Sequence, residues 1–522
     1  MKFDDVISEL GDFGPYQKRV YFLTCLTSFC VSMQILAGVF IQATPDHRCS
    51  LPDLPNDTYT SQGPWHDALV NASIPWDGDD ELYDQCRLRR VPGGLDNDTV
   101  SCDKWVYSKD PFEDTFVTDT NLVCDKQPLV TYASVILMLG MLFGSLLLGI
   151  LSDTIGRKKV ALISSVGLSV SSVSVAWANS YGLFVVLRFL VSFFGTGMIL
   201  STFVMAMELV GPNKRRVAGN TVNLFWSSGL LIEAALAYGL REWKHLQLVI
   251  CIPCILVFFI YAIFLPESAR WLLQKGKTKE ASKIILKMAE VNKVALSKKA
   301  RTLEAVEFEK GDKKIWHVLS SRTLLMRSLI ILFNWVVTSM MYYGLSLNAG
   351  DLSGNIYLNF VLMAVAELAS FIFCLFILDI TGRKLLHVSS MILGGGACIA
   401  TIFPVLYGAG DLEWVTLVLS LVGKFGATAG FAVIYMFTAE LFPTVMRNSV
   451  IGVGSLCARI GGILSPFIGN LGKMFSGPFG IALPLVVFGG LSVTAGVLVL
   501  FLPETTNKSL PETMKDSKNF GR

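Results

Sequence analysis

The segment Leu151-Ser-Asp-Thr-Ile-Gly-Arg-Lys-Lys159 returns in shortened form as Leu378-Asp-Ile-Thr-Gly-Arg-Lys384. Each copy joins two long apolar runs, and the shared aspartates are 226 residues apart. Two more motifs repeat in the same order: Met207-Glu-Leu-Val-Gly-Pro-Asn-Lys-Arg215 as Ala439-Glu-Leu-Phe-Pro-Thr-Val-Met-Arg447, and Leu265-Pro-Glu-Ser268 as Leu502-Pro-Glu-Thr505. Their offsets are 232 and 237 residues. This regularity predicts two similar halves related by an axis along a membrane normal.

Twelve apolar runs surround these motifs, six in each half. The chain has 522 residues, 52% hydrophobic and 16% charged, whereas soluble proteins carry about 25% charged residues. A helix needs about 20 apolar residues to cross a hydrocarbon core of about 30 Å. The runs are 20–43, 128–151, 160–179, 182–206, 218–240, 246–265, 325–347, 355–378, 386–407, 412–438, 449–471 and 480–502. We therefore predict an all-α membrane protein with twelve transmembrane helices, in six-helix halves at 20–265 and 325–502.

The charge distribution predicts the orientation of these helices. Residues 44–127 hold 17 acidic and 7 basic residues, whereas residues 266–324 hold 14 basic and 7 acidic residues. Basic residues favour the cytoplasmic side. We therefore expect an extracellular loop at 44–127 and a cytoplasmic linker at 266–324. With an even number of spans, the N-terminal segment 1–19 and the tail 503–522 are then both cytoplasmic, in a multi-pass protein of the plasma membrane.

The N-terminal segment and the linker complete this organisation. Residues 1–19 are acidic and lack the basic start and cleavage site of a signal peptide, so we expect the first run to be retained as a span. Within the basic linker, residues 278–291 are predicted to form a short amphipathic helix.

The acidic loop has features of an oxidising extracellular compartment. Its four cysteines allow three disulfide pairings, among which the sequence does not choose. It also carries three N-glycosylation sequons. The cysteines are Cys49, Cys86, Cys102 and Cys124, and the sequons begin at Asn56, Asn71 and Asn97. The seven remaining cysteines lie in apolar runs, where we expect them to pack in the core.

Two opposite charges interrupt apolar runs near mid-membrane depth. Glu367 lies 12 residues before Asp379, which is roughly 18 Å along a helix, and Arg459 lies 10 residues after Ser449, roughly 15 Å. Charges at this depth are costly and usually face a wet cavity or pair with each other. We interpret both residues as contacts for a charged solute. The alternative is a structural Glu367–Arg459 salt bridge without ligand contact.

The chain resembles the organic cation, carnitine and organic anion transporters of the major facilitator superfamily over almost its whole length. The markers are Gly11-Asp-Phe-Gly-Pro-Tyr-Gln17, Ala43-Thr-Pro-Asp-His-Arg-Cys49, Ser152-Asp-Thr-Ile-Gly-Arg-Lys158, Pro266-Glu-Ser-Ala-Arg-Trp-Leu-Leu273, Tyr342-Tyr-Gly-Leu345 and Ala439-Glu-Leu-Phe-Pro-Thr-Val-Met-Arg-Asn448. The resemblance implies the major facilitator fold, a substrate cavity between the halves and alternating access. It also implies that a chain with an acid in span eight and a base in span eleven is most similar to the carnitine-type members, which accept zwitterions.

Further substrate contacts are expected from aromatic and polar residues, because aromatic faces hold ammonium groups by cation–π contact worth about 0.5–2 kcal/mol. The aromatic candidates are Tyr342, Tyr343, Phe431, Tyr435, Trp226 and Phe225; the polar candidates are Gln34, Asn223, Glu233 and Lys424. For any single aromatic residue, core packing or lipid contact is the alternative. Glu233 lies near the outer end of its span, where it either reaches water or recruits cations.

The repeated loop motifs predict ion pairs that latch helix ends in one state and release in another. We expect Asp153 to pair with Arg157, Glu208 with Arg215 or Arg216, and Glu440 with Arg447. The other gating candidates are Asp379, Arg383 and Arg188, of which Arg188 occupies the position matching Lys424 at an offset of 236. The alternative is that these basic residues only set the topology.

Several function classes find no support in the sequence. It lacks a phosphate-binding Gly-x-x-x-x-Gly-Lys-Ser/Thr loop and a His-Glu-x-x-His metal motif, so we expect no enzyme, no metal and no cofactor. Nucleic-acid binding is not expected. Coupling to Na⁺ or H⁺ and the oligomeric state stay open, although a monomer suffices for transport. We predict a carrier of small organic cations or zwitterions in the lipid bilayer, with an organic anion exchanger using Arg459, or a non-transporting receptor, as alternatives.

Overall fold

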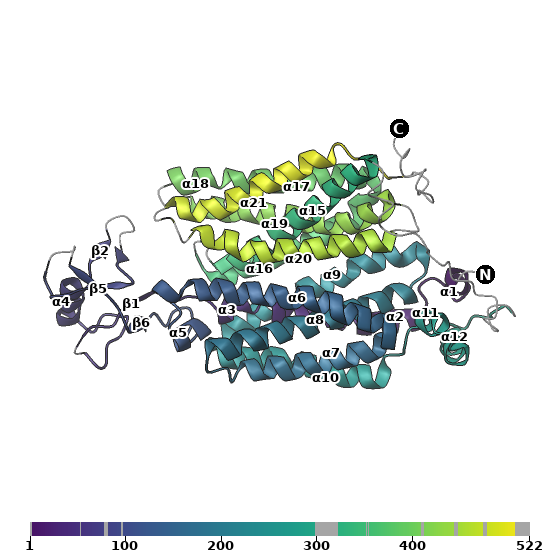
Figure 1. The fold of residues 1–522 in the computed structure, drawn as a ribbon, viewed down its shortest axis with the longest axis horizontal. Helices are drawn as coiled ribbons and strands as arrows, with labels where there is room; N and C mark the ends of the chain where they lie inside the picture. Colours follow the sequence, from purple (N-terminus) through teal and green to yellow (C-terminus); the bar gives the residue numbers. More distant parts are fainter. Residues whose placement is uncertain are drawn as a thin grey trace.

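Long helices run side by side through the molecule, and a small mixed subdomain projects from one end (Figure 1). The computed structural model describes residues 3–52, 54–77, 82–94, 98–297, 322–350, 352, 354–408, 412–442, 447–472, 475 and 478–506. We call the end with the subdomain the loop face. The opposite end, where the chain begins near α1 (Phe3–Glu9), is called the terminal face.

The N-terminal half is built from α2 (Pro15–Leu36), α3 (Gly38–Ile41), α6 (Pro128–Ile155), α7 (Arg157–Val175), α8 (Tyr181–Leu209), α9 (Arg215–Gly239) and α10 (Trp243–Phe264). Local signals set several starts. Proline occupies the first turn of α2 and α6, where its missing N–H costs nothing. Ser180 caps α8 by accepting a hydrogen bond from the Leu183 N–H.

The C-terminal half repeats this arrangement with α15 (Arg322–Leu347), α16 (Ile356–Thr381), α17 (Arg383–Ala400), α18 (Ile402–Tyr407), α19 (Glu413–Leu441), α20 (Arg447–Leu471) and α21 (Pro478–Val499). Between α15 and α16 lies the short 3₁₀ helix η3 (Asn348–Gly350). The packing of α15 on α20 is close because Gly461 has no side chain: a Cβ there would overlap the Val336 carbonyl oxygen.

In the described parts of the chain, eleven helices are long and apolar enough to cross a membrane. The fifth predicted span is not among them, although α9 is present there with 25 residues. Its composition explains the difference, because α9 carries Glu233, Asn220 and two arginines in its first turn. The predicted linker helix is confirmed as α12 (Thr278–Asn292), which follows the short α11 (Ala269–Gln274) at the terminal face.

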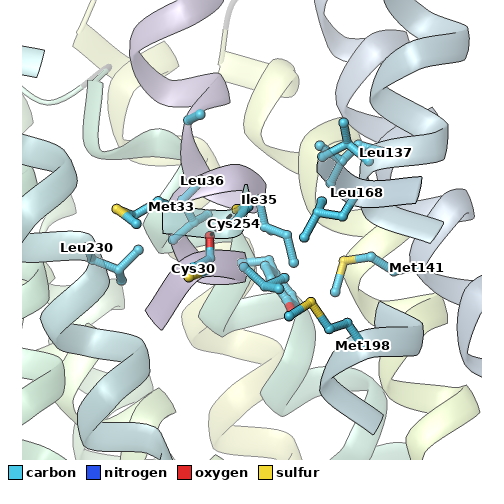
Figure 2. Packing of buried hydrophobic residues seen from close by; sticks show 14 of the residues in the cluster. Cys30, Met33, Ile35, Leu36, Leu137, Met141, Leu168, Met198, Leu230 and Cys254 are labelled. Atoms are coloured by element: carbon cyan, nitrogen blue, oxygen red, sulfur yellow. Dashed lines mark hydrogen bonds between the residues drawn. The ribbon is translucent and has the colours of Figure 1, made fainter. Parts of the chain in front are cut away.

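The halves meet along two helix pairs. In one, α6 packs against α20, and in the other α9 packs against α16. One large buried core runs through the N-terminal half and continues into α15 and α16 of the C-terminal half, which also has a smaller core of its own. Figure 2 shows part of the N-terminal core, where Met33 and Leu36 of α2 lie among residues of neighbouring helices, including Met198 and Leu230. The two seams and the shared core join the halves in the conformation described here.

In its described residues, the loop-face subdomain contains three short antiparallel strand pairs, two α-helices and the 3₁₀ helix η1 (Cys124–Lys126). The pairs are β1 (His47–Cys49) with β6 (Trp105–Tyr107), β2 (Trp76–Asp77) with β3 (Leu82–Tyr83), and β4 (Arg87–Arg89) with β5 (Thr99–Ser101). The helices are α4 (Pro64–Ser73) and α5 (Phe116–Thr120). Such small strand pairs bury little apolar surface, so the subdomain depends on covalent and polar links.

Two disulfides provide the covalent links, and they resolve the pairing that the sequence leaves open. Cys49 joins Cys102, and Cys86 joins Cys124, with Cα–Cα distances of 5.7 Å in both. Of the predicted glycosylation sites, Asn56 and Asn71 are exposed. Asn97 lies outside the described residues.

A buried charge cluster provides the polar link. The Asp57 carboxylate accepts hydrogen bonds from the Arg48 guanidinium at 2.5 and 2.9 Å and from the Leu51 N–H at 2.8 Å, and it contacts His66 Nε2 at 3.0 Å. Burial raises the pKa of Asp57, but the bonds from Arg48, His66 and Leu51 outweigh burial and hold this pKa below its ordinary value.

This cluster makes the stability of the subdomain depend on pH. Because the folded-state pKa of Asp57 is depressed, its contribution is complete above the ordinary aspartate pKa and is lost as pH falls through the folded-state value. We expect Asp57→Asn to lower the melting temperature of the purified protein at neutral pH and to flatten its decline toward acid pH. Asp67→Asn, at an exposed position on α4, is the matched control. Parallel acid profiles for wild type and Asp57→Asn would contradict this role.

Candidate functional site

Half-way along the bundle, four helices of the C-terminal half bring most of the predicted substrate residues together. Tyr342 and Tyr343 come from α15, Glu367 from α16, Lys424, Phe431 and Tyr435 from α19, and Arg459 from α20. Of the N-terminal half, α9 adds Trp226 and Ser227. We call this set the midplane site.

Glu367 and Lys424 form a fully buried ion pair at the centre of the midplane site. The Lys424 Nζ–Glu367 Oε2 distance is 2.8 Å, and the two side chains are 1% and 0% exposed. The structure therefore gives Glu367 a different partner from the Glu367–Arg459 bridge considered above. Arg459 approaches Tyr343 and Tyr435 instead.

The Lys424 ammonium group has two further partners. It lies 3.5 Å from the centroid of the Tyr342 ring, a cation–π contact. It also donates a hydrogen bond of 2.6 Å to the Ser346 hydroxyl. One amino group thus meets a carboxylate, an aromatic face and a hydroxyl, which are the groups that would receive an organic ammonium ion.

Arg459 differs from Lys424 because part of it is accessible. Its side chain is only partly buried, whereas its buried Nε atom has no hydrogen-bond partner. Tyr435, beside it, keeps 36% of its surface exposed although it lies deep in the bundle against Trp335. This combination indicates solvent-reachable space next to the guanidinium. A guanidinium with free donors can bind a carboxylate through two parallel hydrogen bonds.

Aromatic rings form a continuous set between the two charged groups. Ring centroids are 5.2 Å apart for Tyr342–Tyr343, 5.6 Å for Tyr342–Phe431 and 5.8 Å for Phe431–Tyr435. Sequence reasoning missed Trp335, which is fully buried, packs on Tyr435 at 4.4 Å and donates to the Thr438 hydroxyl. The sequence signal that could have identified Trp335 is its position in span seven, two helical turns before Tyr342.

Two hydrogen bonds connect the midplane site to the other half. The Trp226 indole N–H donates to the Tyr342 hydroxyl at 2.9 Å, and the Ser227 hydroxyl donates to Glu367 Oε1 at 2.9 Å. The carboxylate that holds Lys424 is therefore also bonded across the seam. Any solute that displaces Lys424 from Glu367 would act on a residue that both halves share.

The remaining predicted substrate residues lie elsewhere. Gln34 is fully buried in its own half, where it donates to the Ile250 carbonyl at 3.0 Å and accepts from Gln247 at 3.1 Å. Phe225 packs against Phe22 of α2 at 5.6 Å. Asn223 is half-buried, and its backbone carbonyl accepts from Ser227. Thus none of these three is bonded to the C-terminal residues of the site in the interactions described here.

Arg188 and Glu233 are both buried inside the N-terminal half. Arg188 donates to the Gln34 carbonyl at 2.9 Å and is 1% exposed. Glu233 is 0% exposed. The expectation that Glu233 reaches water near the outer end of its helix is therefore wrong for this conformation, because the surrounding helices cover it.

At the terminal face, each half contains the same polar cluster, which we call a clamp. In the N-terminal clamp, Arg157 lies 2.8 Å from Asp153 and 3.5 Å from Glu208, and Glu208 also accepts from the Ser268 hydroxyl. In the C-terminal clamp, Arg383 contacts Glu440 at 3.2 Å, and Glu440 accepts from Thr505 at 2.6 Å.

The third repeated motif explains the rest of each clamp. Glu267 accepts the backbone N–H of Lys158 at 3.0 Å, and Glu504 accepts those of Arg383 and Lys384 at 3.1 Å each. These carboxylates thus satisfy free N–H groups at the starts of α7 and α17 and complement the helix dipoles. Sequence reasoning recorded the motif as a repeat but missed its role as a cap.

The clamps confirm the predicted Asp153–Arg157 pair. Among the described side chains, the base that contacts Glu208 is Arg157 rather than Arg215, and the base that contacts Glu440 is Arg383. The pairings of Glu208 with Arg216 and of Glu440 with Arg447 stay predictions. Arg215 instead contacts Asp4 at 2.7 Å and so fastens α1 to α9. The side chains of Arg447, Arg216 and Asp379 lie outside the described residues.

Asp4 is held at the terminal face by a second base as well. Arg270, in α11, also contacts it. Burial raises the pKa of Asp4, but the hydrogen bond from Arg215 and the charge of Arg270 keep this pKa below its ordinary value. This N-terminal helix is therefore tied to α9 of the N-terminal half and to α11 of the linker.

The clamps lead to a prediction about stability. Arg383→Ala removes a charge-assisted contact between α17 and α19, and hydrogen bonds to charged groups are worth about 1.5–3 kcal/mol. We expect a lower melting temperature of the purified protein and a similar loss for Arg157→Ala, because the two clamps match. Lys159→Ala, at an exposed position, should have little effect. Unchanged melting of both arginine variants would show that the clamps do not stabilise the halves.

Near the loop face, a cavity of about 460 Å³ lies between the halves. Gln42, Asp46 and Asp110 line it from the N-terminal side, and Asn348 and Asn470 from the C-terminal side.

An aromatic group joins the halves at the same end. Phe40 of α3 contacts Tyr357 at 5.8 Å and Phe360 at 4.9 Å, and Tyr238 of α9 contacts Tyr357 at 5.5 Å. The Tyr357 hydroxyl donates to the Pro111 carbonyl of the subdomain at 3.1 Å. In this conformation the halves are thus in contact near the loop face.

Comparison with solved structures defines the class of protein. The chain aligns with the proton:xylose symporter XylE bound to 6-bromo-6-deoxy-D-glucose over 97% of its length and 99% of that chain, with a TM-score of 0.62 and 15% identity. A partially occluded inward-open XylE from E. coli also gives a TM-score of 0.62, at 16% identity over 95% and 100% of the two chains. The fold is therefore that of the major facilitator superfamily.

Sequence comparison defines the family. Residues 98–516 match the family model described as sugar (and other) transporter. The chain is 37% identical to an organic cation transporter protein of Drosophila melanogaster, over 100% of its length and 95% of that relative. It is 33% identical to human solute carrier family 22 member 13 (99% and 93% covered) and 31% identical to human organic cation/carnitine transporter 2 (98% and 93%). The chain belongs to the solute carrier 22 family of organic cation, organic anion and carnitine transporters.

Proposed function

We propose that the protein carries small organic zwitterions across the plasma membrane by alternating access, with the solute bound at the midplane site. The solute's carboxylate binds Arg459, and its ammonium group lies against Tyr342, Phe431 and Glu367. The observation that carries this proposal is the Arg459 guanidinium, which is partly accessible and has a buried Nε atom without a hydrogen-bond partner.

The proposed orientation follows from chemistry on the two faces. Acidic residues, exposed sequons and disulfides fit an extracellular loop face, and the basic linker fits a cytoplasmic terminal face. Both termini are then cytoplasmic. The names of the relatives, which include organic cation and carnitine transporters, support the same class of solute.

Organic anion exchange is the second candidate, and a specific observation favours it. Lys424 neutralises Glu367, so the midplane site carries one net positive charge, which is that of Arg459. A carboxylate without an ammonium group would satisfy that charge while the Lys424–Glu367 pair stays intact. The two candidates therefore differ in whether the solute's ammonium group displaces Lys424.

Uptake into proteoliposomes tests the proposal. The panel contains carnitine, a simple amine, an amino-acid derivative and a dicarboxylate, each measured with and without sodium. Zwitterion uptake above that of the amine and the dicarboxylate supports the proposal. Preferred dicarboxylate uptake and exchange would instead establish the second candidate. If all four solutes bind without uptake or exchange, the protein is a receptor and the proposal fails.

A further inference from the structure

Glu233, on α9, is a buried acid that the proposed substrate site does not use. Its side chain is 0% exposed, and neither carboxylate oxygen accepts a hydrogen bond. Its neighbours along the helix, Leu230, Ala234 and Ala237, are buried apolar residues. A charged carboxylate in such surroundings is strongly disfavoured unless it is paired and hydrogen-bonded.

Arg188 is the base that acts on Glu233 electrostatically. The two groups do not form an ion pair within 4 Å in this conformation, and Arg188 donates instead to the Gln34 carbonyl while its Nε atom has no partner. Both side chains are thus buried, and each has at least one polar atom without a hydrogen-bond partner. Such a pair is poised to close when the helices shift.

The other groups on the helices around α9 do not replace Arg188. From α16, Glu367 engages Lys424 of α19 and Ser227. From α2 and α10, the buried polar groups are amides, thiols and hydroxyls, such as Gln34, Gln247, Cys254, Ser32 and Tyr261, which carry no compensating charge. A metal cation would be repelled by Arg188. A proton is therefore the ligand that best suits Glu233.

The position of α9 connects this acid to the transport cycle. This helix packs mainly on α2 and on α16 of the other half, and less on α8, which carries Arg188. Trp226 and Ser227, about two turns before Glu233, bond across the seam to Tyr342 and Glu367. Movement of the halves therefore acts directly on α9, and a shift of α9 against α8 would change the Glu233–Arg188 separation.

We propose that Glu233 binds a proton whose movement is coupled to solute transport. Glu233 is protonated in the conformation described here, and in the alternate conformation it loses the proton and pairs with Arg188. The coupling rests on the proposed function, because it requires that the protein transports a solute, whereas proton binding itself does not.

The first test measures carnitine accumulation in proteoliposomes driven by a pH gradient. The membrane potential is held at zero with K⁺ and valinomycin, and the internal pH is followed with pyranine. For one proton per solute, we expect accumulation of up to about tenfold for each pH unit, together with carnitine-dependent proton movement across the membrane. Glu233→Gln, which mimics the protonated acid, should lose both responses. Glu413→Gln, an exposed acid at the start of α19, should keep both.

The second test needs no solute and therefore separates this inference from the proposed function. Infrared difference spectra of the purified protein between acidic and alkaline buffer should contain the C=O stretch of a protonated carboxylic acid that Glu233→Gln lacks. Absence of that band, or a pH-driven accumulation that survives in Glu233→Gln, would overturn the inference. Accumulation that follows sodium and ignores pH would overturn it as well. If the wild-type protein does not exchange carnitine, that result counts against the proposed function. The infrared band then tests only whether Glu233 binds a proton.

Discussion

Arg459→Ala is expected to reduce uptake of carboxylate-bearing solutes by about 10- to 150-fold, while uptake of simple amines changes much less. The loss corresponds to the charge-assisted hydrogen bonds that the guanidinium makes to a carboxylate, worth about 1.5–3 kcal/mol. Initial uptake rates over a range of solute concentrations measure the effect. Cell-surface abundance must be measured in parallel, because Arg459 is also close to Tyr343 and Tyr435.

Arg459→Lys is the matched variant for this prediction. Lysine keeps the positive charge but cannot present two parallel N–H groups to one carboxylate, so we expect uptake between that of wild type and Arg459→Ala. An equal loss for carboxylates and amines, together with reduced surface abundance, would mean that Arg459 serves the packing of α20 rather than solute binding.

Lys424→Ala is expected to cause the largest loss of stability. Removing one partner of a buried ion pair leaves the other charge uncompensated, at a cost of about 3–5 kcal/mol. Glu367 would keep its bond from Ser227 but lose the ion pair and its only nearby cation among the contacts described. Thermal melting of the purified protein measures the effect.

The double variant Glu367→Gln with Lys424→Gln separates charge from packing. Because both charges are removed together, we expect it to recover most of the stability that Lys424→Ala loses. Glu367→Gln alone should lower stability, since Lys424 then stays buried with only Tyr342 and Ser346. If the double variant were less stable than both single variants, side-chain packing rather than charge would determine how this pair contributes to stability.

The helices could be predicted well because their signals are local. Apolar runs located every long helix, including α9, which is not among the candidate membrane spans of the described residues. The amphipathic pattern in the linker predicted α12 to within one residue. The repeated motifs predicted two matching halves, and the clamps match residue for residue between Arg157 and Arg383 and between Glu208 and Glu440.

The partners of charged residues were harder to predict because they depend on how helices rotate against each other. Glu208 and Arg215 are neighbours in sequence, yet they turn in different directions, Glu208 toward α7 and Arg215 toward α1. The alternative pairing of Glu367 with Arg459 rests on depth alone, whereas the structure pairs Glu367 with Lys424. The sequence did offer one hint, because Lys424 occupies the position in the repeat that matches Arg188. Each base donates a hydrogen bond to the first helix of its half: Arg188 to Gln34 of α2 and Lys424 to Ser346 of α15.

The hydrogen bond from Tyr357 to Pro111 has a consequence for reagents that bind at the loop face. The subdomain is continuous in sequence with the N-terminal half, but this bond attaches it to α16 of the other half. When the loop face opens, the bond must break and the subdomain must tilt away from α16. A nanobody raised against the subdomain and the outer end of α16 together would therefore recognise one stage of the cycle and hold the carrier there.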